Sequence, residues 1–270
     1  MVKKIKQKRI MHFILFGLLI PALCSAITPD EPGRAIESAE PAVRLDAVRR
    51  MAVESQAGSL PYLIRAAGDD DEYVRERAVQ GLGLSGSPQA VEPVRKALGD
   101  SDAFVRWRAV QAVGRLGDRE AISGLETCAR DEFWRVRASV YEALAAFEGE
   151  RVDRLLTSGL EDPDQRVSLA AAAALAQRKN ISVLPVLLDL LKNGSMFVRD
   201  RAAVALGDLG DLAAVEPLIE AVADPRNEME DQGRDWARWG AIQGLVKLTG
   251  QDFDLEVDKW KNWWRDNRPE

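Results

Sequence analysis

The stretch that decides the fold is Gly194–Asp224, GSMFVRDRAAVALGDLGDLAAVEPLIEAVAD. It predicts two short amphipathic helices joined by a turn that contains glycine. Copies of this stretch recur along the chain with a period of 31 residues, which indicates a repeat architecture. Stepping back from Val198 by that period meets a valine at every step without a gap. These valines are Val167, Val136, Val105, Val74 and Val43.

Each valine marks the predicted buried face of a first helix. The residues four and eight positions after it are also apolar, and these three positions share one face of a helix. A second helix follows in each repeat, after turn signals such as Gly117-Asp118 and Gly210-Asp211. Its apolar column is Leu63, Val94, Leu125, Leu156, Leu187 and Leu218. Short polar residues precede the first helices and are predicted to cap them: Asp71, Asp102, Asp164 and Ser195.

A repeat of this length cannot complete a hydrophobic core alone, because one buried Val or Leu contributes only about 1.5–3 kcal/mol. Stacking against neighbouring repeats supplies the missing core, which is the principle of a solenoid. The small residues that recur four positions after the valines, such as Ala78 and Ala109, allow the helices to approach closely. We therefore expect one elongated all-α domain.

The repeats resemble the HEAT-like repeats of bacterial and phycobilisome-lyase type. The matching pattern is V-R-x-x-A-x-x-A-L-G at Val198–Gly207, followed by L-G-D-x-x-A-V-E-P-L at Leu209–Leu218. The resemblance covers about residues 36–250. It implies a right-handed α-solenoid of about seven two-helix repeats, of a kind that mostly serves as a binding scaffold.

The N-terminal 26 residues have the layout of a secretory signal peptide. A basic start is followed by the apolar run Ile10–Leu23 and by Cys24-Ser25-Ala26, which suits cleavage after Ala26. An uncleaved membrane anchor and lipid attachment at Cys24 are the alternatives. The expected organisation is a signal peptide (1–26), a linker (27–35), the solenoid (36–250) and a Trp-rich cap (251–270). In the seventh repeat about eight residues are inserted near Arg226–Gly233.

Cleavage would make an acidic protein more acidic, since it removes five basic residues and shifts the formal net charge from −6 to −11. Nucleic-acid binding needs a basic face, so it is not expected. We predict an exported protein, periplasmic or secreted, whose mature chain is not embedded in a membrane.

No catalytic, metal or cofactor site is evident in the sequence. His12 is the only histidine and lies in the leader, so the His-Glu iron site of HEAT-repeat hydroxylases is not available. The inserted loop holds Glu228, Glu230 and Asp231 without the spacing of a calcium loop, and a solvated loop is the preferred interpretation. Cys128 lies in a column of small or apolar residues and is predicted to be a core thiol rather than a nucleophile.

An arginine follows the valine in most repeats. The column can be an anion-binding ladder or a structural ladder, in which each arginine bonds an acidic residue or a carbonyl of a neighbouring turn. We favour the structural ladder, because Asp69, Asp100, Asp131 and Asp162 recur with the same period. The predicted ladder comprises Arg44, Arg75, Arg106, Arg137, Arg199 and Arg238.

Two features are candidates for partner binding. The first is aromatic and comprises Phe104, Trp107, Phe133 and Trp134, for which packing between repeats is the alternative. The second is a charge gradient along the second helices, which we expect to line the concave surface; chance is the alternative. Its charged members are Arg65, Lys96, Asp189 and Glu220.

The predicted function is a non-enzymatic exported scaffold that binds a protein or peptide on the solenoid surface. One alternative is a bilin-lyase-like enzyme, which rests on the family resemblance alone. The other is a structural module of an envelope complex.

Overall fold

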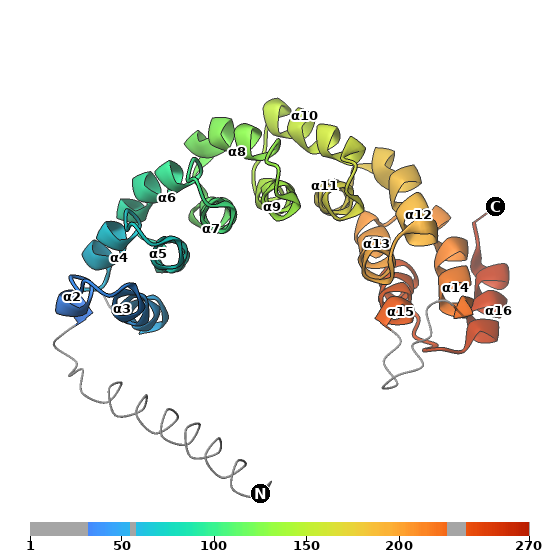
Figure 1. Ribbon diagram of the computed structural model, residues 1–270. Coiled ribbons are helices and arrows are strands. Elements are labelled where there is room, and N and C mark those ends of the chain that lie inside the picture. The colour runs from blue at the N-terminus through green and yellow to red at the C-terminus, as the bar shows by residue number, and fades with distance from the viewer. Residues whose placement is uncertain (1–31, 55–57, 226–235, 270) are drawn as a thin grey trace, which may run out of the picture. The chain divides into compact units, whose positions relative to one another are not determined.

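The computed structural model describes residues 32–54, 58–225 and 236–269, and over these residues the chain is all-α without strands. The leader 1–26, the start of the linker and the inserted loop with Glu228, Glu230 and Asp231 lie outside the described residues. Contacts within the chain group it into two compact units, one up to Pro93 and one from Val94. The helices alternate along both units as first and second helices of successive repeats (Figure 1).

The helices of the first unit belong to the first two repeats. They are α2 (Pro32–Ala35), α3 (Pro41–Glu54), α4 (Leu60–Ala66), α5 (Glu72–Ser85) and the 3-10 turn η1 (Pro88–Ala90). Helix α6 (Val91–Ala97) contains the boundary. The second unit holds α7 (Ala103–Leu116), η2 (Arg119–Ala121), α8 (Ile122–Cys128), α9 (Trp134–Leu144), α10 (Glu150–Ser158), η3 (Gly159–Glu161), α11 (Gln165–Gln177), η4 (Ile181–Val183), α12 (Leu184–Asn193), α13 (Met196–Leu209), η5 (Leu212–Ala214), α14 (Val215–Ala223), α15 (Trp236–Thr249) and α16 (Val257–Asn267).

Two layers of helices make up the second unit. The first helices pack in sequence, α7 on α9, α9 on α11, α11 on α13 and α13 on α15. The second helices α8, α10, α12 and α14 form the other layer (Figure 1). The predicted valine column is buried from Val74 to Val198, and Val43 in the first repeat is half-buried. The second-helix column from Leu63 to Leu218 is buried throughout, so the predicted core is confirmed.

Three of the four predicted helix caps are confirmed. The carboxylates of Asp71 and Asp102 each accept two backbone N–H bonds at the start of α5 and α7, and Asp164 accepts one at the start of α11. The prediction for Ser195 was wrong: it precedes α13, but its side chain makes no capping hydrogen bond. Its ψ is 161°, whereas ψ at Asp71 is 126°, so the backbone enters α13 at a different angle.

The turns after the first helices use a left-handed residue. Gly117 and Gly210 take φ values of 67° and 84°, which glycine adopts without strain. Lys179 holds the equivalent position in the fifth repeat with φ 59°, a conformation that costs a residue with a side chain about 1–2 kcal/mol. The Lys179 ammonium donates to the carbonyl of Asp208 in the next repeat, and Asn180 caps the following 3-10 turn. These contacts help to hold a turn that lacks glycine.

The C-terminal helix α16 packs on the second helix α14 of the preceding repeat. Trp260 is fully buried there, its ring lies 4.9 Å from that of Phe253, and its Nε1 donates to the carbonyl of Asp254 at 2.9 Å. Trp263 and Trp264 stack on each other and remain half-buried. Of the three tryptophans in the predicted Trp-rich cap, Trp260 is therefore the one that contributes most to the core.

Candidate functional site

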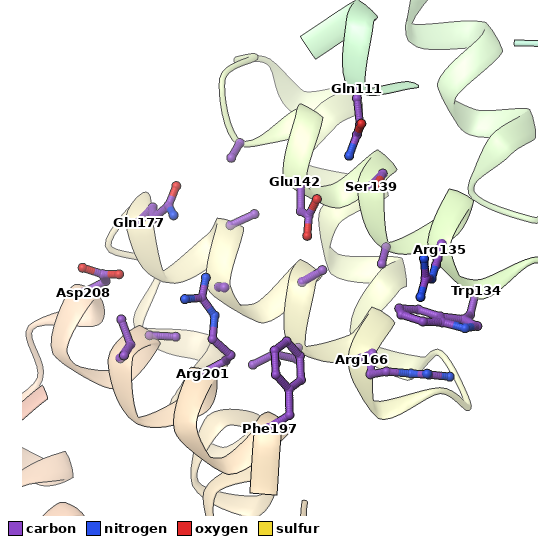
Figure 2. Close-up of a pocket in the computed structure, with 18 of the residues that line it drawn as sticks. Gln111, Trp134, Arg135, Ser139, Glu142, Arg166, Gln177, Phe197, Arg201 and Asp208 are labelled. Atoms are coloured by element: carbon purple, nitrogen blue, oxygen red, sulfur yellow. The ribbon is translucent and has the colours of Figure 1, made fainter. Parts of the chain in front are cut away.

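A groove of about 600 Å³ crosses the first helices α7, α9, α11 and α13 of the second unit (Figure 2). Its floor is low because alanine dominates the middle of these helices. Longer side chains stand on either side of the floor, near the beginnings and near the ends of the helices. The floor residues include Ala138, Ala170, Ala173, Ala174 and Ala205.

Tryptophan and arginine side chains interleave along the edge formed by the helix beginnings. The Arg166 guanidinium lies 3.5 Å from the centre of the Trp134 ring and also binds the carboxylate of Asp164 at 2.5 Å. The Arg135 guanidinium lies 5.3 Å from the Trp134 ring and 5.8 Å from the Trp107 ring. Stacking of this kind fixes the rings, and each contact contributes about 0.5–1 kcal/mol at an exposed site. Trp134 lies between Arg135 and Arg166 in Figure 2.

Polar acceptors line the groove toward the helix ends. Gln111, Glu142, Gln177 and Asp208 come from four successive first helices. Surrounding protein raises the pKa of the Glu142 carboxyl above its ordinary value although the side chain reaches solvent, and the charge of Arg201 opposes this shift only in part. Arg201 extends from α13 toward Glu142 in Figure 2. The groove therefore combines a cationic aromatic edge, an apolar floor and an acceptor edge.

The four predicted aromatic residues come together at the starts of α7 and α9. The ring centres of Phe104 and Phe133 are 5.2 Å apart, and each phenylalanine lies 6.4 Å from the tryptophan of its own repeat. Trp107 Nε1 also donates to Ser139 Oγ of the next repeat at 2.9 Å. The cluster thus packs between repeats and is also partly exposed, since 46% of the Phe104 surface is accessible and both tryptophans line the groove. Its role in partner binding stays a prediction.

The expectation that second helices line the concave surface was wrong for the second unit. The groove lies on the first helices, because their middle positions carry short side chains, and the second helices form the opposite layer. Asp189 lies on α12, where it accepts a hydrogen bond from Asn193, and Glu220 is exposed on α14. Lys96 is exposed on α6, and Arg65 on α4 pairs with Glu37 at 2.9 Å. None of these four residues lines the groove.

Five of the six arginines in the column make contacts of the kind that a structural ladder predicts. In the third repeat Arg106 Nε and Nη2 donate to both oxygens of Asp131, at 2.6 and 3.0 Å, and Nη1 donates to the carbonyls of Asp100 and Ser101. Asp131 also accepts a backbone N–H of its own loop, from Phe133, and Asp69 and Asp162 do the same from Asp71 and Asp164. We call such a contact a rung. Rungs join Arg44 to Asp69, Arg106 to Asp131, Arg137 to Asp162 and Arg199 to Asp224.

The two remaining arginines of the column are placed as follows. Arg75 Nη1 donates to the carbonyls of Asp69 and Asp70, at 2.9 and 3.0 Å, in the same way as its equivalents. Arg238 lies in α15, in the repeat that follows the insertion.

Cys128 is buried, as predicted for a core thiol, and its Sγ lies 3.5 Å from the carbonyl oxygen of Leu98. Burial raises the pKa of this thiol to about 11, with a further contribution from the charge of Asp131, so it is protonated at neutral pH. We expect a thiol reagent at pH 7.5 to modify Cys128 at least a hundredfold more slowly in the folded protein than in urea. Labelling followed by mass spectrometry measures this ratio, and equal rates would contradict the buried placement.

Two features are absent from the part of the chain that the structure describes. No group of three His, Cys, Asp or Glu side chains there is arranged to hold a metal ion. None of its helices has the length and apolar character that crossing a bilayer requires.

Comparison with known proteins settles the family. The sequence profile of HEAT repeats matches overlapping segments at residues 33–106, 60–145, 93–167 and 152–239. The chain belongs to the HEAT repeat family. This HEAT repeat solenoid is similar to a chain in the complex of CpcE and CpcF of phycocyanin lyase from Nostoc sp. PCC7120, with 22% identity and a TM-score of 0.57. That alignment covers 88% of this chain and 94% of the other.

A second similar structure is the archaeal HEAT-like repeats protein from Thermococcus onnurineus NA1. Identity is 16% and the TM-score is 0.51, over 84% of this chain and 98% of the other. At these identities both similarities show the HEAT repeat fold alone. No sequence among curated proteins matches this chain significantly.

The sequence reasoning missed five of the residues that line the groove: Arg135, Glu142, Arg166, Phe197 and Arg201. A signal for three of them was present. The column directly before the valines is large aromatic or cationic in five of the six repeats and reads Ala42, Tyr73, Phe104, Arg135, Arg166 and Phe197. A column of this kind beside a buried one indicates an exposed surface that a partner can contact.

Proposed function

We propose that this HEAT repeat protein is a non-enzymatic scaffold whose groove on α7, α9, α11 and α13 binds a segment of a protein or peptide. The observation that supports it most is the partly exposed Trp107–Trp134 edge beside an alanine floor. Tryptophan and arginine are the residues that most often dominate binding energy at protein interfaces, since they bury a large area in a fixed orientation. The rings here are already held by Arg135, Arg166 and Ser139, which lowers the entropy that binding costs.

The proposal includes export, which is supported by the basic, apolar and small-residue segments of residues 1–26. Expression in a bacterial host followed by mass spectrometry of the N-terminus tests it. A chain that begins at Ile27 in the envelope or culture fluid supports export with cleavage. An intact N-terminus in the cytosol would contradict it.

Binding through the groove is tested by replacing its tryptophans. We expect Trp134→Ala to weaken capture of the partner about tenfold, and Trp107→Ala plus Trp134→Ala to abolish it, because each ring is an anchor of the interface. Partners from envelope or culture fluid are quantified by mass spectrometry after crosslinking, which also maps the crosslinked residues. Trp263→Ala, on α16 outside the groove, is the matched control. If the double variant is folded by circular dichroism and captures the same partners in the same amounts, the groove is not the binding site.

The alternatives give different results. A bilin-lyase-like enzyme would attach a bilin to an apoprotein, and we expect no coloured adduct when the protein is mixed with both. A structural module of an envelope complex would self-assemble, whereas we expect a single species of monomer mass in analytical ultracentrifugation.

A further inference from the structure

Two arginines in the groove have no carboxylate partner among the described residues. Arg135 is exposed and contacts only the rings of Trp107 and Trp134, and Arg201 is exposed and makes no ion pair. Glu142 and Asp200 interact with the charge of Arg201 without coming within ion-pairing distance. By contrast, Arg166 between them is neutralised by Asp164. The groove therefore offers two cationic positions that need an anion, in a chain whose net charge is −6.

These two positions are separated by two repeats. Arg135 belongs to α9 and Arg201 to α13, and α11 packs between these helices. Packed helices lie about 8–10 Å apart, and an extended peptide advances about 3.3 Å per residue. About three residues of an extended chain therefore cross one repeat, and about six separate the two arginines.

The middle of the groove restricts what can lie between the two positions. Between Arg135 and Arg201 the floor is built from Ala138, Ala170 and Ala173, which suits small or apolar side chains and disfavours charged ones. Gln111 and Gln177 at the other edge can donate to and accept from the peptide backbone. Phe197, 62% exposed beside Arg201, adds an apolar contact at that end of the groove.

We propose that the groove selects an extended acidic peptide with two carboxylate side chains about six residues apart and small apolar residues between them. Arg135 binds one carboxylate and Arg201 the other, and the two tryptophans pack on the peptide beside the first. The inference rests on the proposed function, because it names the ligand of the same groove.

The test uses fluorescein-labelled dodecapeptides and the full chain, with affinity measured by fluorescence anisotropy. The reference peptide has two glutamates six positions apart in an Ala/Ser/Val background. In matched peptides the glutamates are three or nine positions apart, or are replaced by glutamine or lysine. We expect each Glu→Gln change to weaken binding about tenfold, since a charge-assisted hydrogen bond is lost. The six-residue spacing should bind most tightly, and binding should weaken from 50 to 500 mM salt.

Charge exchange locates each contact. Arg135→Glu should bind the reference peptide weakly and should prefer a peptide in which one of the two glutamates is replaced by lysine. Arg201→Glu should prefer the peptide in which the other glutamate is replaced by lysine. Which glutamate responds to Arg135→Glu gives the direction of the peptide. Glu148→Arg, at an exposed position outside the groove lining, is the control and should leave the preference unchanged.

Three results would overturn the inference. Equal affinity for glutamate, glutamine and lysine peptides, with loss of binding in Trp134→Ala, would refute the acidic ligand and leave the peptide groove intact. Failure of every peptide to bind would refute the peptide groove as well. A dimer that Arg135→Glu dissociates would show that a second copy of the chain occupies the groove.

Discussion

Replacing Trp260 by alanine is expected to lower the free energy of unfolding by about 3–5 kcal/mol. The Trp260 side chain is fully buried, so its removal leaves a cavity beside the ring of Phe253. The indole N–H bond to the Asp254 carbonyl is lost as well. Because α16 packs on α14, we expect the last repeat to open first rather than the whole chain.

Urea unfolding gives the change in free energy, and hydrogen exchange shows where it acts. We expect amides of α14 and α16 to lose protection, while those of α7 and α9 keep theirs. Trp263→Ala, which removes a half-buried ring of the same type from the same helix, should cost less than half as much. A uniform loss of protection throughout the second unit would show that stability is not divided among the repeats as a solenoid implies.

Asp131→Ala is expected to destabilise the protein by about 3 kcal/mol, because it leaves the Arg106 guanidinium in a largely buried position without its carboxylate. Only 15% of the Arg106 side chain and 7% of the Asp131 side chain are exposed. The same change leaves the backbone N–H of Phe133, which donates to the Asp131 carboxylate, without this acceptor. Glu132→Ala is the control: its side chain is exposed, and its carbonyl, which Arg137 uses, is unaffected. Equal midpoints of urea unfolding for the two variants would contradict a contribution of this rung to stability.

The same rung predicts how stability depends on pH. Burial alone would raise the pKa of the Asp131 carboxyl, but the hydrogen bonds from Arg106 and Phe133 and the charges of Arg106 and Arg137 outweigh it and hold the pKa below its usual range. The unfolded chain, with a pKa near 3.9, therefore takes up the proton first as pH falls. The contribution of the rung is complete above about pH 4 and is lost as pH falls through the lower folded value. Asp131→Asn should reduce the pH dependence of stability below pH 4 and leave its slope above pH 6 unchanged.

The repeat fold could be predicted from sequence because its determinants are local and periodic. The apolar columns that contain Val105 and Leu125 indicate which helix faces are buried, and the constant period predicts that successive repeats stack on one another. The rungs could be predicted for the same reason, since Arg106 and Asp131 recur with that period. Ser195 shows the limit, because the residue type predicts a cap but the backbone angle decides whether one forms.

The groove could be predicted only in part, because it depends on which helical layer carries the hollow. Trp107 and Trp134 could be selected from the sequence because they are large aromatic residues. Arg135 belongs to the groove because it stacks on tryptophans of two different repeats. A contact of this kind joins different columns, and periodicity within one column does not reveal it. The charge gradient of the second helices was visible in the sequence, but in the second unit α12 and α14, which carry Asp189 and Glu220, lie in the layer opposite the groove.

Each rung ties an arginine to an aspartate 25 residues further along, in the loop that opens the following repeat. A duplication or excision of one whole period, such as the 31 codons from Val136 to Arg166, puts every remaining arginine opposite an equivalent aspartate. An insertion or deletion of another length between an arginine and its aspartate shifts the two residues apart and breaks that rung. The gene can thus lengthen or shorten by recombination in steps of one repeat while every rung keeps both of its partners.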